Sequence, residues 1–165
     1  MKVKIAVIVG LIIGLFIGLL ATGIAINLSG ESILFQEIQS PYDYEKTVRI
    51  MRDTITKMDG WHIIKVFDYN KEVQAGGGKP IGNYTIIEFC NSKTAAVMLQ
   101  EDNRKKVGAM LPKRFAIYEK SDGKVYVGAG NGPVMLHLFK NKTRDIAEKV
   151  SLEVQSMLLF KTNQL

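Results

Sequence analysis

The strongest constraint on this chain is an uncharged, apolar stretch near its amino terminus, residues 5–26. About 20 apolar residues are enough for an α-helix to cross the hydrocarbon core of a bilayer. Before this stretch only Lys2, Lys4 and the amino terminus carry charge, and positive charge favours the cytoplasmic side. The sequence therefore predicts a single-pass helix in the cell membrane, with the amino terminus in the cytoplasm and the rest of the chain outside it.

A cleavable signal peptide is the alternative interpretation of the same stretch. Residues 21–23 and 23–25 both resemble the small-residue site at which such peptides are cut. Secretory apolar cores are usually only about 7–15 residues long, which favours a retained anchor here. We therefore assign residues 1–28 to a transmembrane signal anchor, 29–32 to a linker and 33–165 to one extracytoplasmic domain.

Three glycines recur at every fourth position of the predicted anchor: Gly10, Gly14 and Gly18, with Thr22 continuing the series. Small residues at this spacing form a stripe along one side of a helix, where two backbones can approach closely. Glycine is also frequent in membrane helices that do not pair. The regular spacing favours pairing of the anchor with a second copy.

The part of the chain after the predicted anchor has the usual length of a single domain. Its composition excludes some kinds of partner and of cross-link. The whole chain has a net charge of +6, with its basic residues scattered among acidic ones, so a nucleic-acid partner is not expected. Cys90 is the single cysteine, so no intramolecular disulfide can form. The core must be held by packing.

Residue patterns predict strands over residues 33–39, 61–67, 83–90, 114–119 and 124–129, with a tight hairpin turn at residues 121–123. The loops are expected at residues 68–82, which include three consecutive glycines, and at residues 128–133. The glycines of neither loop have the spacing of a phosphate-binding or dinucleotide-binding motif. Residues 134–139 are apolar and left unassigned.

Three helices are predicted from apolar residues at steps of three and four. The first begins after Asp43, carries Val48, Met51, Ile55 and Met58 on one side, and ends at Gly60. The second is capped by Asn91 or Ser92, directs Ala95, Ala96 and Leu99 to the sheet, and is followed by a solvated charged segment at residues 102–107. The third, residues 144–160, is capped by Asn141 or Thr143 and buries Ala147, Val150, Val154 and Met157.

The order strand, helix, strand, strand, helix, strand, strand, helix predicts an α+β fold. We expect a two-layer sandwich in which a mostly antiparallel five-stranded sheet carries its helices on one face. The other face would present Tyr84, Ile86, Glu88, Cys90, Arg114, Ala116, Tyr118 and Tyr126. Tyrosine and arginine are enriched at interfaces, so we predict that this face forms a homodimer.

Several short motifs resemble a known family: Phe89-Cys90-Asn91, then Leu99, Asp102, Leu111-Pro112, Tyr118-Glu119 and Asp122-Gly123-Lys124-Val125. Together they are similar to the family called domain of unknown function 302. The resemblance spans about residues 34–127 and implies a compact α/β domain, commonly a homodimer, with no settled activity. Ser92 and Lys113 depart from it, because the family often has proline and cysteine at these places, so a thiol pair is absent.

Two hypotheses about function follow. The first is a membrane-anchored binding or assembly domain that acts as a homodimer, either structural or holding a small ligand at the dimer cleft. The second is an enzyme or redox sensor centred on Cys90, whose pKa Arg114 or Lys113 would lower. A metal site would need Cys90, Glu88 and either His62 or His137 to converge. No cofactor motif is evident, and a small buried filler is the simpler role for Cys90.

Overall fold

The computed structural model describes residues 2–160, so Met1 of the predicted anchor and the last five residues of the predicted domain lie outside it. The chain divides after Leu34 into two compact units.

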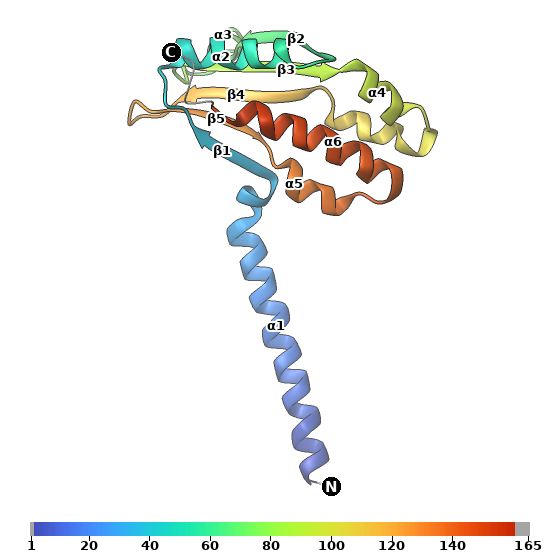
Figure 1. Ribbon diagram of the computed structural model, residues 1–165. Helices are drawn as coiled ribbons and strands as arrows, with labels where there is room; N and C mark the ends of the chain where they lie inside the picture. Colours follow the sequence, from blue (N-terminus) through green and yellow to red (C-terminus); the bar gives the residue numbers. More distant parts are fainter. Residues whose placement is uncertain (1, 161–165) are drawn as a thin grey trace. The chain divides into compact units, whose positions relative to one another are not determined.

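The first unit is a single helix, α1 (Lys2–Leu34) (Figure 1). Its segment Val7–Ile24 is long and apolar enough to cross a membrane and is wholly exposed, although a signal sequence near an amino terminus has the same features. The helix continues through the predicted linker at residues 29–32. The first strand consequently begins at Phe35, two residues later than predicted.

The second unit contains one antiparallel sheet. Its strands are β1 (Phe35–Gln39), β2 (Trp61–Asp68), β3 (Tyr84–Asn91), β4 (Lys113–Glu119) and β5 (Val125–Gly130). They are arranged in the order β1-β5-β4-β3-β2, and every neighbouring pair is antiparallel. This confirms the predicted five-stranded sheet and its α+β class.

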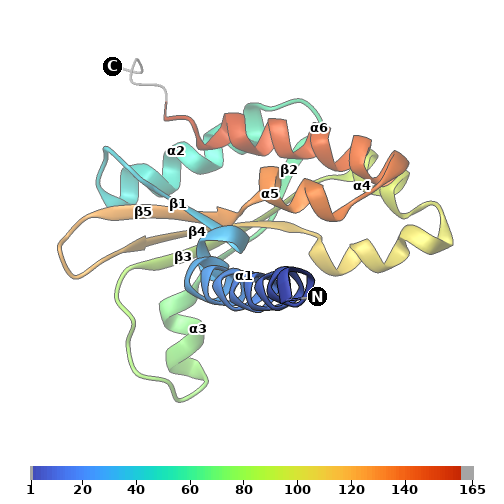
Figure 2. The same ribbon diagram turned by 90° about the horizontal axis from the view of Figure 1, so that it is seen from below.

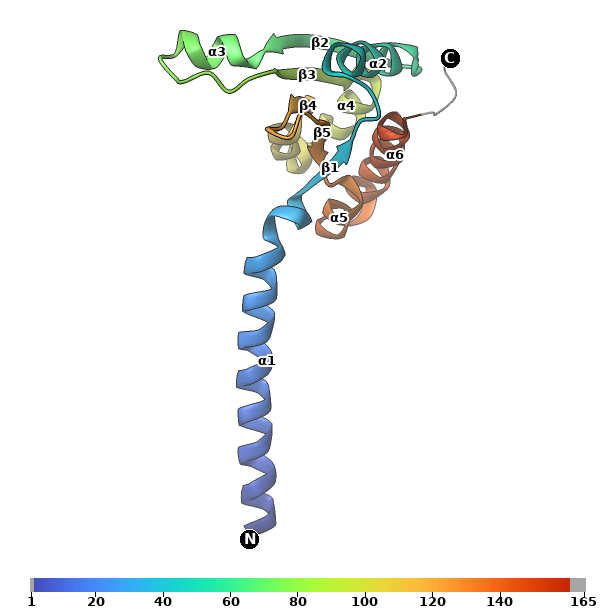
Figure 3. The same cartoon turned by 90° about the vertical axis from the view of Figure 1, so that its left-hand side faces the viewer.

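The three predicted helices pack on one face of this sheet: α2 (Tyr44–Lys57), α4 (Ser92–Leu99) and α6 (Asn141–Leu158). Figures 2 and 3 show α2 and α6 on the same side of the strands. Other helical segments were not predicted, namely α3 (Tyr69–Ala75), η1 (Asp102–Met110), α5 (Gly132–Met135) and η2 (Leu136–Leu138). The predicted loop at residues 68–82 therefore begins with α3, which lies on the opposite side of the sheet from α2 and α6 (Figure 2).

The first predicted helix, α2, is confirmed in detail. The carboxylate of Asp43 accepts a hydrogen bond from the backbone N–H of Lys46 at 2.8 Å, which satisfies one of the free amides of the first turn. Met51 and Ile55 are fully buried against the sheet. Gly60 follows the helix with a φ of +76°, a conformation that glycine adopts at little cost.

Two details of the other long helices were predicted wrongly. In α4, Met98 is buried and Ala96 is exposed, because the helix presents the side of Met98 to the core. Helix α6 begins at Asn141 with Lys140 in the capping position and no capping hydrogen bond from that side chain, so neither Asn141 nor Thr143 caps it. Its predicted stripe is otherwise correct, since Val154 and Met157 are buried.

Arg104 is an exception in the segment 102–107, whose residues 102, 103, 105 and 106 are exposed as predicted. It is only 9 % exposed. Its Nε donates a hydrogen bond to the backbone oxygen of Met98, and its Nη2 donates one to that of Val97, both at 3.0 Å. These carbonyls lie in the last turn of α4, where a helix leaves its oxygens without internal partners. Arg104 thus joins η1 to the end of α4.

Candidate functional site

The sheet face opposite α2, α4 and α6 carries the residues predicted for it. Across β3, β4 and β5 the register pairs Tyr84 with Tyr118 and Tyr118 with Tyr126. The same register pairs Ile86 with Ala116 and Glu88 with Arg114. Their neighbours along each strand, including Ile87, Phe89, Phe115, Ile117 and Val127, are buried on the other face. We call this side the open face.

A row of four tyrosines crosses the open face. The ring centroids of Tyr69 and Tyr84 are 5.6 Å apart, those of Tyr84 and Tyr118 are 5.3 Å apart, and those of Tyr118 and Tyr126 are 6.3 Å apart. The last two pairs are stacked, with interplanar angles of 14° and 23°. These separations suit attractive contacts between aromatic rings. Tyr69, at the start of α3, extends the row beyond the residues that were predicted.

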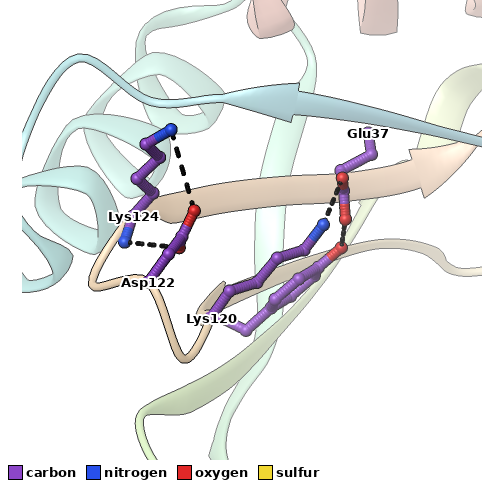
Figure 4. A network of polar contacts seen from close by, with 5 residues as sticks. Glu37, Lys120, Asp122 and Lys124 are labelled. Atoms are coloured by element: carbon purple, nitrogen blue, oxygen red, sulfur yellow. Dashed lines mark hydrogen bonds and ion pairs between the residues drawn. The ribbon is translucent and has the colours of Figure 1, made fainter.

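A small polar network lies at one end of this row (Figure 4). Lys120 donates to Glu37 with its Nζ 2.7 Å from the carboxylate, and Tyr118 donates its hydroxyl hydrogen to the same group. The hydrogen bond from Lys120 is the main cause that lowers the pKa of Glu37, and Tyr118 adds to it. Burial and the bond to Glu37 raise the pKa of Tyr118. Lys120 also lies 4.1 Å from the ring centroid of Tyr126.

Farther along the open face, Arg114 and Cys90 do not meet in the way that a reactive thiol needs. Arg114 Nε lies 2.7 Å from Glu88 Oε1, and the Glu88 side chain is only 15 % exposed. Burial raises the pKa of the Cys90 thiol, an effect that Lys113 opposes only in part. The thiol is therefore mostly protonated at neutral pH, which does not favour a thiolate nucleophile.

The predicted metal ligands are only partly gathered. Cys90 lies opposite His62 in the pairing of β3 with β2, while the Glu88 carboxylate is held by Arg114. His137 lies in η2, a 3₁₀ turn separate from these strands. Within residues 2–160 no group of three or more His, Cys, Asp or Glu side chains is placed to hold a metal ion.

A cavity of about 490 Å³ lies on the helix-covered side of the domain, at the end of the sheet where β3 finishes and β4 begins. It is partly open to solvent. Its wall is mainly apolar and comes from all five strands and from α4, η1, α5, η2 and α6. Apolar residues of the wall include Phe35, Trp61, Phe89, Ala95, Met98, Val107, Met110, Leu111, Met135, Leu136, Phe139, Ile146, Ala147, Val150 and Val154. Cavities of this size and character are typical of small-molecule sites.

The charges of this cavity are of one sign. Lys113 and Arg114 line it, and none of its lining residues in the described chain is acidic. Arg114 already pairs with Glu88, whereas no described acidic side chain is within ion-pair distance of Lys113. Lys113 is half-buried, and burial lowers its pKa. The hydroxyl of Ser151 and the side chain of Thr94 add polar groups to the wall.

Sequence patterns alone did not reveal this cavity. Part of its wall comes from η1, α5 and η2, where the strand and helix periodicities predicted only a charged segment, a loop and an unassigned apolar stretch. One signal was present in the strand itself. Lys113 stands two residues before Phe115, so a strand that began one residue earlier than predicted would place it on the buried face.

Comparison with known proteins now identifies the family. A family model described as "Domain of unknown function DUF302" matches residues 36–159. The chain belongs to the DUF302 family. A solved structure of an uncharacterized conserved DUF302 protein from Bacillus stearothermophilus is 18 % identical, with a TM-score of 0.64 over 76 % of this chain and 95 % of that one. Its likeness supports the DUF302 fold, and no curated protein matches the chain.

The two departures from the family pattern have distinct places in this DUF302 chain. Ser92 is the first residue of α4, directly after Asn91, whose side chain accepts a hydrogen bond from the N–H of Thr94 at 3.2 Å. Lys113 is the first residue of β4 and lines the cavity. A cationic side chain thus stands where many members of the family are expected to carry a thiol.

Proposed function

We propose that this chain is a membrane-anchored, extracytoplasmic binding domain that holds a small, mainly apolar molecule in its cavity. The cavity of about 490 Å³ between the sheet and the short turns is the observation that carries this proposal. Burial of apolar surface supplies the driving force, at about 0.8 kcal/mol for each methylene taken out of water. A site of this kind needs no catalytic group, in agreement with the mostly protonated Cys90.

The single tryptophan provides a direct measurement of occupancy. Trp61 lines the cavity and is 6 % exposed, with its indole N–H donating to Glu153 at 2.7 Å. We suggest reconstituting the full chain in phosphatidylcholine vesicles and titrating 10-bromodecanol, an uncharged amphiphile that quenches indole fluorescence on contact. Saturable quenching of Trp61 is expected. Quenching that only rises in proportion to the probe would show partition into lipid and would contradict the proposal.

Two adjacent alanines of α4 give a matched pair of variants. Ala95 lines the cavity, whereas Ala96 is exposed and does not. Ala95→Phe should fill part of the cavity and weaken the saturable quenching at least several-fold. Ala96→Phe adds the same side chain to the same helix and should leave it unchanged. If both variants weakened the quenching equally, the probe would be binding somewhere other than in the cavity.

A second candidate function, assembly as a homodimer through the open face, is favoured by the tyrosine row. Large aromatic side chains in a continuous row are typical of the centres of interfaces. The face also carries charges of both signs, Glu37 and Glu88 beside Arg114 and Lys120. Such a surface is suited to pairing with its own copy about a twofold axis, because each acidic group can meet a basic one.

Light scattering of the full chain in detergent tests the dimer. The wild type should have the mass of two chains after correction for detergent, and Tyr118→Ser should shift it towards one. Tyr42→Ser is the matched control, since Tyr42 lies outside the open face and contacts Phe160 instead. A monomeric wild type would refute the homodimer.

A further inference from the structure

We propose that the molecule held in the cavity is an amphiphile with one anionic group, a carboxylate or a phosphate, and that Lys113 pairs with this group. The inference rests on the proposed binding function and adds the chemical class of the ligand. It begins from the position of Lys113 at the start of β4, on the same face of the strand as the buried Phe115 and Ile117.

The surroundings of Lys113 indicate which kind of chemical group would pair with its ammonium. Lys113 lines a mainly apolar cavity, and the described acidic side chains all lie beyond ion-pair distance of its ammonium. A charged group that is removed from water without a partner costs free energy. An anion brought by the ligand would supply the missing partner, and hydrogen bonds between charged groups are the strong ones.

The second cation of the wall, Arg114, already has an acidic partner. Arg114 Nε is engaged by Glu88 Oε1 at 2.7 Å, and the two residues are directly paired across β3 and β4. Residues 113 and 114 also point to opposite sides of the strand. The charge of Arg114 is thus balanced by Glu88 and its side chain is 62 % exposed, whereas Lys113 lies on the buried side of the strand with no described acidic side chain within ion-pair distance.

The rest of the wall defines the other end of the ligand. The side chains of Met98, Met110, Leu136 and Phe139 are apolar, and methionine adapts its shape readily to chains of different form. An alkyl or aryl tail of moderate length satisfies this wall. Affinity should then rise about fourfold for each methylene added to the tail, until the cavity is full.

A comparison of headgroups on one tail tests the inference. The full chain in phosphatidylcholine vesicles would be titrated with 10-bromodecanoate, 10-bromodecyl phosphate and 10-bromodecanol, with quenching of Trp61 as the signal. For each variant we take the ratio of the dissociation constant of the alcohol to that of each anion. Partition into lipid is common to all variants and cancels when these ratios are compared.

The ratio for the preferred anion should be about tenfold or more higher in the wild type than in Lys113→Met. A difference of this size is expected for a hydrogen bond to a charged group. Lys113→Arg keeps the positive charge and should retain most of the preference. Lys57→Met removes an exposed lysine from the last turn of α2 and should leave the ratio unchanged. The larger of the two anion ratios identifies the headgroup as carboxylate or phosphate.

The outcomes separate this inference from the proposed function. Saturable quenching by 10-bromodecanol together with equal ratios in the wild type and Lys113→Met would keep the binding function and overturn the role of Lys113. Proportional quenching by all three probes would overturn both. The thermal midpoint of Lys113→Met, monitored by circular dichroism, should be no lower than that of the wild type, because the variant removes a half-buried charge. A changed ratio then reports binding and not loss of the fold.

Discussion

At the scale of single residues, Arg104 shows how a charged side chain can hold two elements together. Its guanidinium donates to two carbonyls in the last turn of α4. Arg104→Ala should lower the free energy of unfolding by about 2 kcal/mol, because a buried hydrogen bond to Met98 and a partly buried one to Val97 both lose their charged donor. Chemical denaturation of the detergent-solubilised chain measures this change.

The neighbouring residue provides the control for that prediction. Lys105 is exposed and forms an ion pair only with the exposed Asp102, at 2.6 Å. Exposed pairs of this kind contribute little, so Lys105→Ala should change the free energy of unfolding by no more than about 0.5 kcal/mol. If the two variants were equally stable, the hydrogen bonds of Arg104 would not contribute to the free energy of unfolding.

Glu37 leads to a prediction about acid stability. Its pKa is lowered from an ordinary value of 4.5, first by the hydrogen bond from Lys120 and then by that from Tyr118. A carboxyl group whose pKa is lower in the folded state stabilises the fold fully above its unfolded pKa. This contribution is lost as the pH falls through the folded pKa. The network should therefore weaken below about pH 4.5.

The measurement is the thermal midpoint of the wild type and of Glu37→Gln from pH 7 to pH 3. The wild type should be the more stable above about pH 5, and the difference should shrink steadily at lower pH. Lys120→Gln should reduce the same acid-dependent difference, because Lys120 is the main cause of the shift. A gap between wild type and Glu37→Gln that persists unchanged to pH 3 would rule out this linkage.

Residue patterns predicted the sheet face on which a side chain lies more reliably than its hydrogen-bond partner. Alternation along β3 and β4 placed Tyr84 and Tyr118 together on the open face, because strand geometry is local. The partner of Tyr118 is Glu37, which lies 81 residues earlier in the sequence, on β1. Only the order of strands in the sheet brings them together, and the sequence patterns contain no sign of it.

At the scale of elements, the start of α2 offers a quantitative test. Asp43 accepts from the N–H of Lys46 and lies at the positive end of the helix dipole. Asp43→Ala should cost about 1 kcal/mol of unfolding free energy, measured by chemical denaturation. Asp53→Ala changes an exposed aspartate of the same helix away from its first turn and should cost clearly less. Equal losses would mean that the capping bond is not the cause.

Helices that bury a stripe of apolar residues were predicted, and those that bury little were missed. The stripe of α2 contains Met51 and Ile55, both fully buried, and produces a clear period in the sequence. Helix α3 has no buried residue, so its sequence contains no such period. The cavity wall shares this difficulty. Segments α5 and η2 are too short for a period to be recognised, and η1 is a 3₁₀ helix, whose repeat of three residues differs from the α-helical one.

At the scale of the whole molecule, the proposed anchor and the proposed ligand class support each other. Amphiphiles with an alkyl tail partition into bilayers, and a tethered domain would be held where their concentration is highest. Fusion of an alkaline phosphatase reporter to the carboxyl end tests the predicted side of the membrane, since this enzyme is active only outside the cytoplasm. An inactive fusion, with a cytoplasmic reporter active at the same place, would reverse the topology.

The stripe of small residues in α1 supplies the last prediction. Within this chain, a side chain added at Gly10, Gly14 or Gly18 would meet nothing within 4 Å. Gly14→Ile should therefore leave the helix itself intact and affect only contact with a second helix. If α1 and the open face both pair in the same dimer, each contact raises the effective concentration for the other.

Energy transfer between labelled full-length chains in vesicles, measured over a range of protein-to-lipid ratios, tests this coupling. Gly14→Ile and Tyr118→Ser should each shift association to higher protein density, and the double variant should associate less than either. Leu15→Ile, next to the stripe, is the control for the anchor. A double variant that associates like the wild type would show that neither surface joins the chains, because no second contact would remain to compensate for the first.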